Sequence, residues 1–320
     1  MQCPSCGATI IVGDRFCEEC GVSLVTETTN SNSKGGCEKC GAAPVEIDEE
    51  GYCSKCGFRN RKSETDRIET LISSILAGIS DRGFKHLTNE DYLACAKLDN
   101  QNSYILVVCD GVSSSQSPEL AAKAAADTVC LTLSNAMEKG DISPEEAMKL
   151  AMKSALASVS AIPHLNSKDD PPSTTIVAAI VQNRTATIGW LGDSRAYWIS
   201  TQNSRLLTKD HSWVNDMVSS GEMTEAEARL SPNAHGITRW LGSDSEADWE
   251  PSMVKFNIPN SGYLLLSTDG LWNYTPDANQ ITELVKQNSG ADALKICQGL
   301  VEFALRMGGH DNITVALVSL

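Results

Sequence analysis

Acidic side chains stand at the ends of several predicted strands, where a rigid element can hold them in place. Three of these strands are short apolar runs that stop at or just before an aspartate, and two others begin just after an acidic residue. A short apolar run that ends at a turn signal is typical of a strand buried on both faces. The acidic residues at these strand ends are Glu90, Asp91, Asp110, Asp193, Asp269 and Asp311.

These carboxylates are candidate ligands for divalent cations. Like charges gathered in one place repel each other and raise each other's pKa unless a cation neutralises them. Carboxylate oxygens without histidine or cysteine suit Mg²⁺ or Mn²⁺ better than Zn²⁺. Gly111, directly after Asp110, lets the backbone turn and lets a ligand approach its carbonyl oxygen. A single Asp-Gly pair favours a simple turn, but its repetition leads us to predict that the strand ends meet around metal ions.

A second set of metal-binding side chains consists of four Cys-x-x-Cys pairs, each followed by glycine, within the first 56 residues. Two such pairs can complete a closed tetrahedral site of four thiolates, which is typical of structural zinc. A redox-active pair is the alternative, but no βαβ pattern lies beside it. We therefore predict two zinc ions, bound by Cys3, Cys6, Cys17 and Cys20 and by Cys37, Cys40, Cys53 and Cys56. Both units resemble short zinc ribbons, whose folding energy comes from the metal.

Composition and charge limit the partners and the compartment of the chain. Its 320 residues carry a net charge of −15, which argues against general binding to nucleic acids or anionic membranes. No apolar run approaches the ~18 residues of a membrane span, and the start has neither a basic nor an apolar targeting segment. Paired cysteines bind metals in a reducing compartment, so we expect a cytoplasmic protein.

The remaining pattern predicts how these side chains are positioned. Strands, a helical pair, more strands with a polar helix over residues 211–230 among them, another helical pair and a last strand indicate an α+β fold with sheets inside and helices outside. The domains expected from this order are 1–25 (zinc ribbon), 26–36 (linker), 37–58 (zinc ribbon), 59–76 (connector) and 77–320 (large domain).

Seven motifs in the large domain carry a resemblance to a known family. They are Asn89-Glu90-Asp91, Asp110-Gly111, Ser173-Thr174-Thr175, Gly192 to Tyr197, Leu207 to Ser212, Thr268 to Trp272 and Asp311 to Val315. In this order they resemble the metal-dependent serine/threonine protein phosphatases of the type-2C or PPM family, over about Ala77 to Leu320. The resemblance implies a central β-sandwich flanked by helix pairs, in α-β-β-α layers, with a site for two Mg²⁺ or Mn²⁺ ions at one end.

The resemblance also implies a role for each acidic residue of the main site. Asp110 matches the carboxylate that bridges both metal ions, and Asp269 and Asp311 match ligands of one of them. Glu90 and the carbonyl of Gly111 match contributors to the other, partly through water. The family's reaction is direct attack of the bridging water on phosphorus, without a phospho-enzyme.

Other matched positions lie around this main site. Asp91 resembles the acid that orients metal-bound water, and Asp193 matches a position linked to a weak third metal ion. The segment Ser212 to Arg239 resembles the flap that helps to choose substrates. Arg195 has two open readings, a contact to phosphate or a brace for the end of the sheet.

Three positions depart from the family pattern. His86 stands where the family often has an arginine that binds the substrate phosphate, so it is the candidate for that contact. The loop Val112 to Ser115 replaces a glycine-rich loop and lacks the histidine that some relatives use as a general acid. Asn273 replaces an aspartate of many members, which predicts a weaker third metal site.

Two functions remain open at this point. The resemblance implies a hydrolase acting on phosphoserine or phosphothreonine in proteins, with zinc ribbons that recruit a substrate, a kinase or a scaffold. The alternative is a binding or sensing protein that keeps the fold with little activity and acts through its ribbons, which His86 and the serine-rich loop favour. Nucleic-acid binding by the ribbons is disfavoured by the acidic stretches Glu18-Glu19 and Asp48-Glu49-Glu50.

Overall fold

A computed structural model describes residues 36–37, 39–48, 51–58, 60, 66–98, 103–164, 171–242, 249–288 and 290–320. The chain divides into two compact units, Met1–Asn60 and Arg61–Leu320. Most of the predicted linker 26–36 and the four cysteines of the first predicted ribbon, Cys3, Cys6, Cys17 and Cys20, lie outside the described residues. In the smaller unit a single turn of 3-10 helix, Pro44–Glu46, lies between the two described cysteine pairs.

The larger unit contains two antiparallel sheets of long strands. In sheet order, the six-stranded one consists of β1 (Arg67–Ser73), β2 (Leu76–Asp81), β13 (Ile313–Ser319), β12 (Tyr263–Ser267), β8 (Arg195–Ile199) and β9 (Arg205–Leu206). The five-stranded one consists of β11 (Ser252–Asn257), β7 (Thr185–Leu191), β6 (Ile176–Gln182), β4 (Ser103–Asp110) and β3 (Asp91–Leu98). A short pair, β5 (Ser173–Thr174) and β10 (Leu241–Gly242), lies apart from both.

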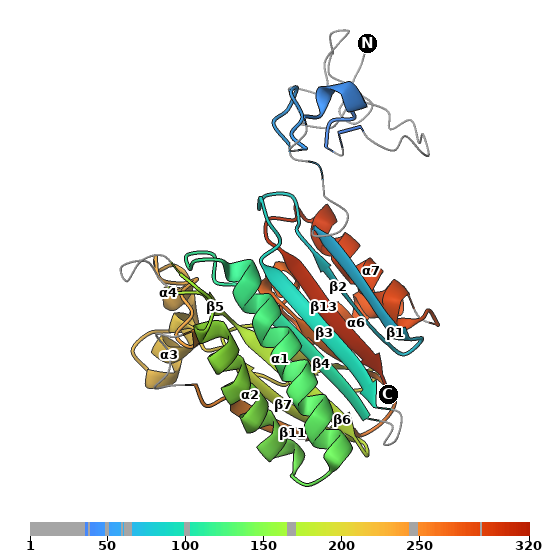
Figure 1. The fold of residues 1–320 in the computed structure, drawn as a ribbon, viewed down its shortest axis with the longest axis vertical. Coiled ribbons are helices and arrows are strands. Elements are labelled where there is room, and N and C mark those ends of the chain that lie inside the picture. Colours follow the sequence, from blue (N-terminus) through green and yellow to red (C-terminus); the bar gives the residue numbers. More distant parts are fainter. Residues whose placement is uncertain are drawn as a thin grey trace. The chain divides into compact units, whose positions relative to one another are not determined.

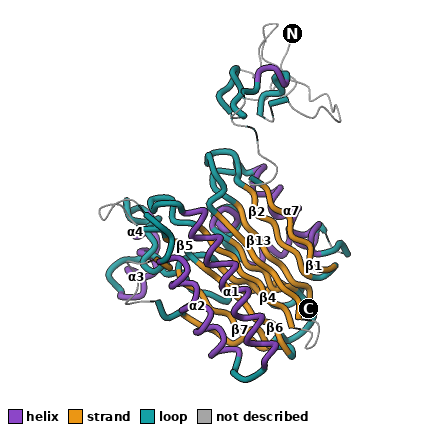
Figure 2. The backbone as a smooth tube through the Cα atoms, viewed as in Figure 1, coloured by secondary structure: helices purple, strands orange, loops and turns teal. Residues whose placement is uncertain are grey.

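Helices cover the outer face of each sheet, as Figures 1 and 2 show. The five-stranded sheet packs against α1 (Pro118–Lys139) and α2 (Pro144–Ser160) through one apolar core. The six-stranded sheet packs against α6 (Ala278–Lys286) and α7 (Ala293–Arg306) through another. A third core fills the space between the sheets. The layers are therefore helix, sheet, sheet and helix, as the family resemblance implied.

Local sequence signals explain where the first helical pair begins and ends. Proline opens α1 at Pro118, and Gly140 ends it in the left-handed region with φ 68°. At the start of α2, the hydroxyl of Ser143 accepts from the backbone N–H of Glu146, whose carboxylate accepts from the N–H of Ser143. Of these signals, the proline near the start of α1 and the cap at Ser143 are those from which the sequence predicted the helices.

The polar helix expected over residues 211–230 is wrong in one respect, because the segment forms two short helices. These are α3 (Trp213–Ser220) and α4 (Glu225–Arg229). Gly221 ends α3 in the left-handed region with φ 75°, and Thr224 starts α4 with its own capping box to Glu227. A glycine and a new cap only a few residues apart interrupt the helix.

The first strand, β1, lies within the stretch 59–76 for which the sequence suggested a connector. It is an edge strand with few buried side chains, so its residues Arg67–Ser73 show no apolar run. The antiparallel pairing with β2 starts at Arg67 and Asp81. Among the described helices, including the short α5 (Asp269–Trp272), none has the length and apolar character to cross a membrane.

Candidate active site

The strand ends that carry acidic residues meet in the structure. Asp110 ends β4 and faces Asp91, the first residue of β3, across the antiparallel pair. Asp269 opens α5 directly after β12, Asp311 precedes β13, and Asp193 lies between β7 and β8. Burial, followed by the charges of Asp91, Asp269, Asp193 and Asp311, raises the pKa of Asp110 well above its usual range. Carboxylates from both sheets therefore share one electrostatic environment.

The pKa values of the other carboxylates in the cluster are raised as well, except that of Asp311. Burial and neighbouring charges raise the pKa of Asp269 well above its usual range, and burial raises those of Asp91 and Asp193 to about 7. For Asp311, burial raises the pKa, but the hydrogen bond and the charge of His86 outweigh it and the pKa is lowered. Clustered carboxylates of raised pKa are the environment that a divalent cation would stabilise.

The spread of the oxygen atoms bears on how many ions would fit. Within the described ranges, the carboxylate oxygens of no three acidic residues lie within 4.8 Å of one another, so they do not outline the shell of a single ion. Two ions ~3.5–4 Å apart spread their ligands over a larger volume, and Mg²⁺ keeps several water ligands. The carboxylate cluster fits divalent cations by its oxygen donors and by its raised pKa values.

Hydrogen bonds from the other sheet fix the side chain of Asp91, which is 4% exposed. The hydroxyl of Thr268, at the end of β12, donates to Oδ2 of Asp91 at 2.8 Å. The same hydroxyl accepts from the backbone N–H of Thr314 in β13 at 3.0 Å. Because the carboxylate of Asp91 is held by two strands, its orientation is set before any ligand binds.

Glu90 and Gly111 lie next to each other, as their predicted shared role requires. The backbone N–H of Gly111 donates to the carbonyl of Glu90 at 3.1 Å. A Cβ atom at Gly111 would lie 2.5 Å from the carbonyl oxygen of Pro118 and 2.7 Å from that of Glu90, so only glycine fits. The hydroxyl of Ser113 donates to the carboxylate of Glu90. The serine-rich loop thus orients a predicted metal ligand.

Asn312 has a role that the sequence did not reveal. Its side-chain amide donates to the carbonyls of Arg82 at 2.8 Å and Thr88 at 3.1 Å. Its side-chain oxygen accepts from the backbone N–H of Glu90 at 2.7 Å. Asn312 therefore fastens the loop between β2 and β3 beside Asp311. The only signal in the sequence is its place between an acidic residue and a strand.

His86 lies within this cluster. Its Nε2 atom is 3.1 Å from Oδ1 of Asp311. The hydrogen bond that His86 donates to Asp311, opposed by burial and reinforced by the charges of Asp311, Glu90 and Asp91, raises the pKa of His86. The structure thus places His86 in contact with a predicted metal ligand.

Arg195 makes a two-point ion pair at the start of β8. Its Nη2 and Nε atoms donate to the carboxylate of Asp210 at 2.7 Å and 2.9 Å, and its guanidinium lies 3.7 Å from the ring centroid of Trp272. These contacts suit the brace, but Arg195 also lines a cavity together with Asp193 and Asp269, so both readings from the sequence stay open. Asn273 donates to Oδ2 of Asp269 at 3.0 Å.

A cavity of about 150 Å³ joins the predicted third-metal position to the flap. Its wall includes Asp193 and Asp269 from the carboxylate cluster and Asn215, Arg229 and His235 from the segment 212–239. The predicted flap therefore borders the candidate site, and a ligand in this cavity would contact both.

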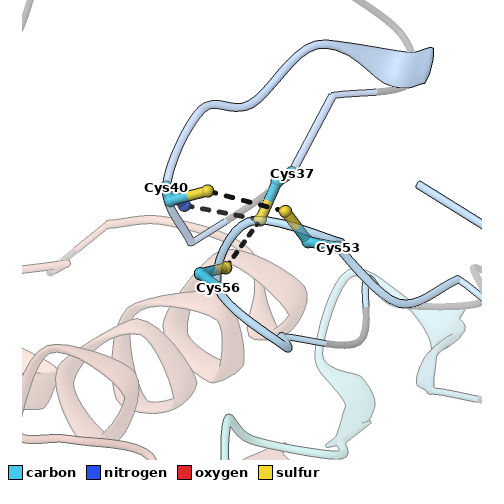
Figure 3. Close-up of side chains that lie close together, drawn as sticks. All are labelled: Cys37, Cys40, Cys53 and Cys56. Atoms are coloured by element: carbon cyan, nitrogen blue, oxygen red, sulfur yellow. Dashed lines mark hydrogen bonds between the residues drawn. The ribbon is translucent and has the colours of Figure 1, made fainter. Parts of the chain in front are cut away.

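The four cysteines of the second predicted zinc site come together in the smaller unit, where their sulfur atoms point toward one another (Figure 3). The sulfur atoms of Cys37 and Cys56 are 3.5 Å apart, and those of Cys40 and Cys53 are 3.7 Å apart. Four sulfur atoms ~2.3 Å from a zinc ion lie about 3.8 Å apart at tetrahedral angles. All four ligand atoms lie within 4.8 Å of one another, so the donor set fits zinc.

The two described cysteine pairs have the same local structure. Gly41 and Gly57 follow their pairs with φ 68° and 69°, in the left-handed region that favours glycine. Their N–H groups donate to the carbonyls of Cys37 and Cys53 at 2.9 Å and 2.8 Å. Each glycine therefore folds the backbone around its sulfur atoms, as the sequence predicted.

Comparisons with known proteins agree with this geometry. The family described as Protein phosphatase 2C matches residues 84–295 of the chain. Among curated proteins, Protein phosphatase PhpP of Streptococcus pneumoniae is 36% identical over 148 residues, which are 46% of this chain and 58% of PhpP. The chain thus spans little more than half the length of this relative.

Solved structures cover more of the large unit. The crystal structure of serine/threonine phosphatase Stp1 from Staphylococcus aureus has a TM-score of 0.63 and 27% identity, covering 79% of this chain and 97% of Stp1. The catalytic domain of serine threonine protein phosphatase PstP, in complex with two manganese ions, has a TM-score of 0.62 and 25% identity, covering 77% of this chain and 97% of that domain. With the fold, the converging carboxylates and the match over 84–295 taken together, the chain belongs to the protein phosphatase 2C family.

Proposed function

We propose that the protein is a metal-dependent serine/threonine protein phosphatase that hydrolyses phosphomonoesters by direct attack of water on phosphorus. The observation that carries this proposal is the shared environment of Asp110, Asp269 and Asp311, which come from distant parts of the chain. The similar PstP domain holds two manganese ions. Its substrates would be phosphoserine and phosphothreonine residues in other proteins.

Each residue has a proposed part in the reaction. Asp110 would bridge two Mn²⁺ or Mg²⁺ ions, Asp269 and Asp311 would bind one of them, and Glu90 and the carbonyl of Gly111 would hold the other. When bound, the ions supply Lewis acidity and lower the pKa of a water nucleophile.

Three further side chains would act around the ions. Asp91, held by Thr268, would orient the attacking water and accept its proton. His86, beside Asp311, would donate a hydrogen bond to the phosphate. Asp193 would line a third and weaker metal site beside the flap.

The experiment that tests the proposal is metal removal. With a phosphothreonine or phosphoserine peptide, we expect release of phosphate that requires Mn²⁺ or Mg²⁺. Treatment with a chelator should reduce the release to background, because the ions supply several kcal/mol of transition-state stabilisation, and added Mn²⁺ should restore it. A chelator would also remove zinc, so adding Zn²⁺ alone is the control that separates loss of the zinc sites from loss of Mn²⁺ or Mg²⁺. Undiminished hydrolysis after chelation would contradict the proposal, and a phospho-enzyme trapped by acid would exclude direct attack.

A second candidate is a low-activity binding or sensing protein with a phosphatase fold. The contact between His86 and Asp311 favours this second function. His86 stands in place of a phosphate-binding arginine, and its side chain is already engaged by Asp311. The same assay separates the two functions: binding of a phosphopeptide without turnover at any Mn²⁺ concentration would favour the second.

We also propose that Cys37, Cys40, Cys53 and Cys56 hold a structural zinc ion, and that Cys3, Cys6, Cys17 and Cys20 hold another. Thiolate sites of this kind persist in a reducing compartment, which supports a place in the cytoplasm. The ribbons would recruit a substrate, a cognate kinase or a scaffold protein.

Replacing Cys53 by serine should lower the zinc content from two ions per chain to one, because a site with three thiolates loses much of its affinity. Elemental analysis of the purified chain measures this ratio. Cys130→Ser is the matched control, since Cys130 is a half-buried thiol of α1 outside the four-cysteine set. Two zinc ions retained by Cys53→Ser would contradict a site that needs all four of these thiolates.

A further inference from the structure

An arginine lies buried beside the candidate active site. Arg82 directly follows β2 and is 2% exposed, which makes it one of the largest fully buried side chains among the described residues. Its Nε atom lies 3.3 Å from Oδ2 of Asp66, which is also 2% exposed. A buried guanidinium requires such a partner, because an isolated charge is strongly unfavourable away from water.

The same side chain reaches the loop between β2 and β3, residues 82–90. Its Nη1 atom donates to the carbonyl of His86. The backbone N–H of Arg82 donates to the carbonyl of Asp66 at 2.7 Å, and the carbonyl of Arg82 accepts from Asn312 at 2.8 Å. Arg82 therefore joins three segments: the residue before β1, the 82–90 loop and the turn before β13.

The 82–90 loop needs such a support because it turns tightly around Asp311. Gly83 has φ 70°, and a Cβ atom there would lie 2.2 Å from the carbonyl oxygen of Asp311. The loop carries His86, 3.1 Å from the Asp311 carboxylate, and ends at Glu90. Asn312 fastens its far half through Thr88 and Glu90. Arg82 fastens the near half at the carbonyl of His86.

We propose that Arg82 and Asp66 form a buried positioning pair that holds His86 and the 82–90 loop in the geometry the metal site requires. This inference rests on the proposed phosphatase function. The forked guanidinium serves a carboxylate and a carbonyl at once, which a lysine ammonium on a flexible stem does not. Since Asp66 directly precedes β1, the start of the large unit becomes part of the support of its active site.

The test compares Arg82→Lys with the unsubstituted full chain. Lysine keeps the charge beside Asp66 but loses the second arm of the fork. We expect kcat/KM for a phosphopeptide to fall about 10–100-fold and the Mn²⁺ dissociation constant, measured by calorimetry, to rise in the same range, as for other residues that orient ligands. The thermal unfolding midpoint without Mn²⁺ should change little.

Arg184→Lys is the matched control, because Arg184 also donates to a backbone carbonyl, that of Ile258, from the hairpin turn between β6 and β7. It should keep both Mn²⁺ affinity and activity. If Arg82→Lys does not fold, Asp66→Asn, which keeps the volume and an acceptor oxygen, is read in the same way. Unchanged Mn²⁺ affinity and activity in the folded variant would overturn the positioning role. An unsubstituted chain that binds Mn²⁺ without hydrolysing phosphopeptides would instead refute the proposed function.

Discussion

Asp110→Asn is expected to lower kcat/KM for a phosphopeptide by about 10³-fold or more at saturating Mn²⁺. An amide keeps the shape of the side chain but is neutral and bridges two cations poorly. Metal ions supply several kcal/mol of charge stabilisation in such sites, and ~4 kcal/mol corresponds to about 10³-fold in rate. Initial rates across Mn²⁺ concentrations measure the loss and separate it from weaker metal binding.

The same substitution should stabilise the metal-free protein. Burial and four neighbouring carboxylates raise the pKa of Asp110, so the folded state binds more protons there than the unfolded state. Its ionisation therefore reduces stability as the pH rises above the ordinary value of about 3.9. Asparagine at position 110 does not ionise and escapes this loss, whereas the losses caused by Asp91 and Asp193, whose pKa values are raised to about 7, remain in the variant.

Thermal unfolding of the metal-free proteins measures this effect. The midpoint of Asp110→Asn should exceed that of the unsubstituted chain at pH 8, and the difference should shrink toward pH 4. Asp127→Asn, an exposed change in α1 beside Lys123, is the control and should alter neither activity nor this difference. Full activity in Asp110→Asn, or a lower metal-free midpoint at pH 8, would contradict the assignment of Asp110.

Arg195→Met is expected to cause the largest loss of stability. The side chains of Arg195 and Asp210 are about one-tenth exposed or less and are joined by a short two-point contact. Removing one partner of a buried pair leaves an uncompensated charge and costs about 3–5 kcal/mol. For domains of 150–250 residues, each kcal/mol shifts the unfolding midpoint by roughly 2–4 °C, so we expect a drop of about 6–20 °C.

Arg229→Met provides the contrast, because Arg229 pairs with Glu225 at an exposed position of α4. Exposed pairs contribute about 0–1 kcal/mol, so its midpoint should barely move. Equal midpoints for both variants, with activity lost only in Arg195→Met, would favour the other reading of Arg195, a contact to phosphate.

The parts of the fold that the sequence predicted are those with strong local signals. The apolar runs that end at Asp110 and Asp269 indicate buried strands and the position of their carboxylates. Capping residues such as Ser143 and Gly140 set the bounds of the first helical pair. The repeated glycines after the cysteine pairs predicted the turn of the backbone at each described pair, which Gly41 and Gly57 make.

The parts that it missed depend on contacts between distant residues or on weak local patterns. Asn312 and Arg82 are 230 positions apart. A periodic pattern in the sequence does not indicate that a side chain will connect two distant loops. The edge strand β1 has no apolar run because most of its side chains are at least partly exposed. Gly221 divides the flap helices within a polar stretch whose composition otherwise suits one helix.

The antiparallel pairing of β3 with β4 restricts how the chain length can vary. Asp91 and Asp110 are opposite each other at one end of this hairpin, and residues 99–102 connect its other end. Successive side chains of a strand point to opposite faces, so inserting or deleting one residue within either strand would turn one carboxylate away from the other. Gaps between homologous chains should therefore fall outside β3 and β4, where a change in length leaves the two acids opposite each other.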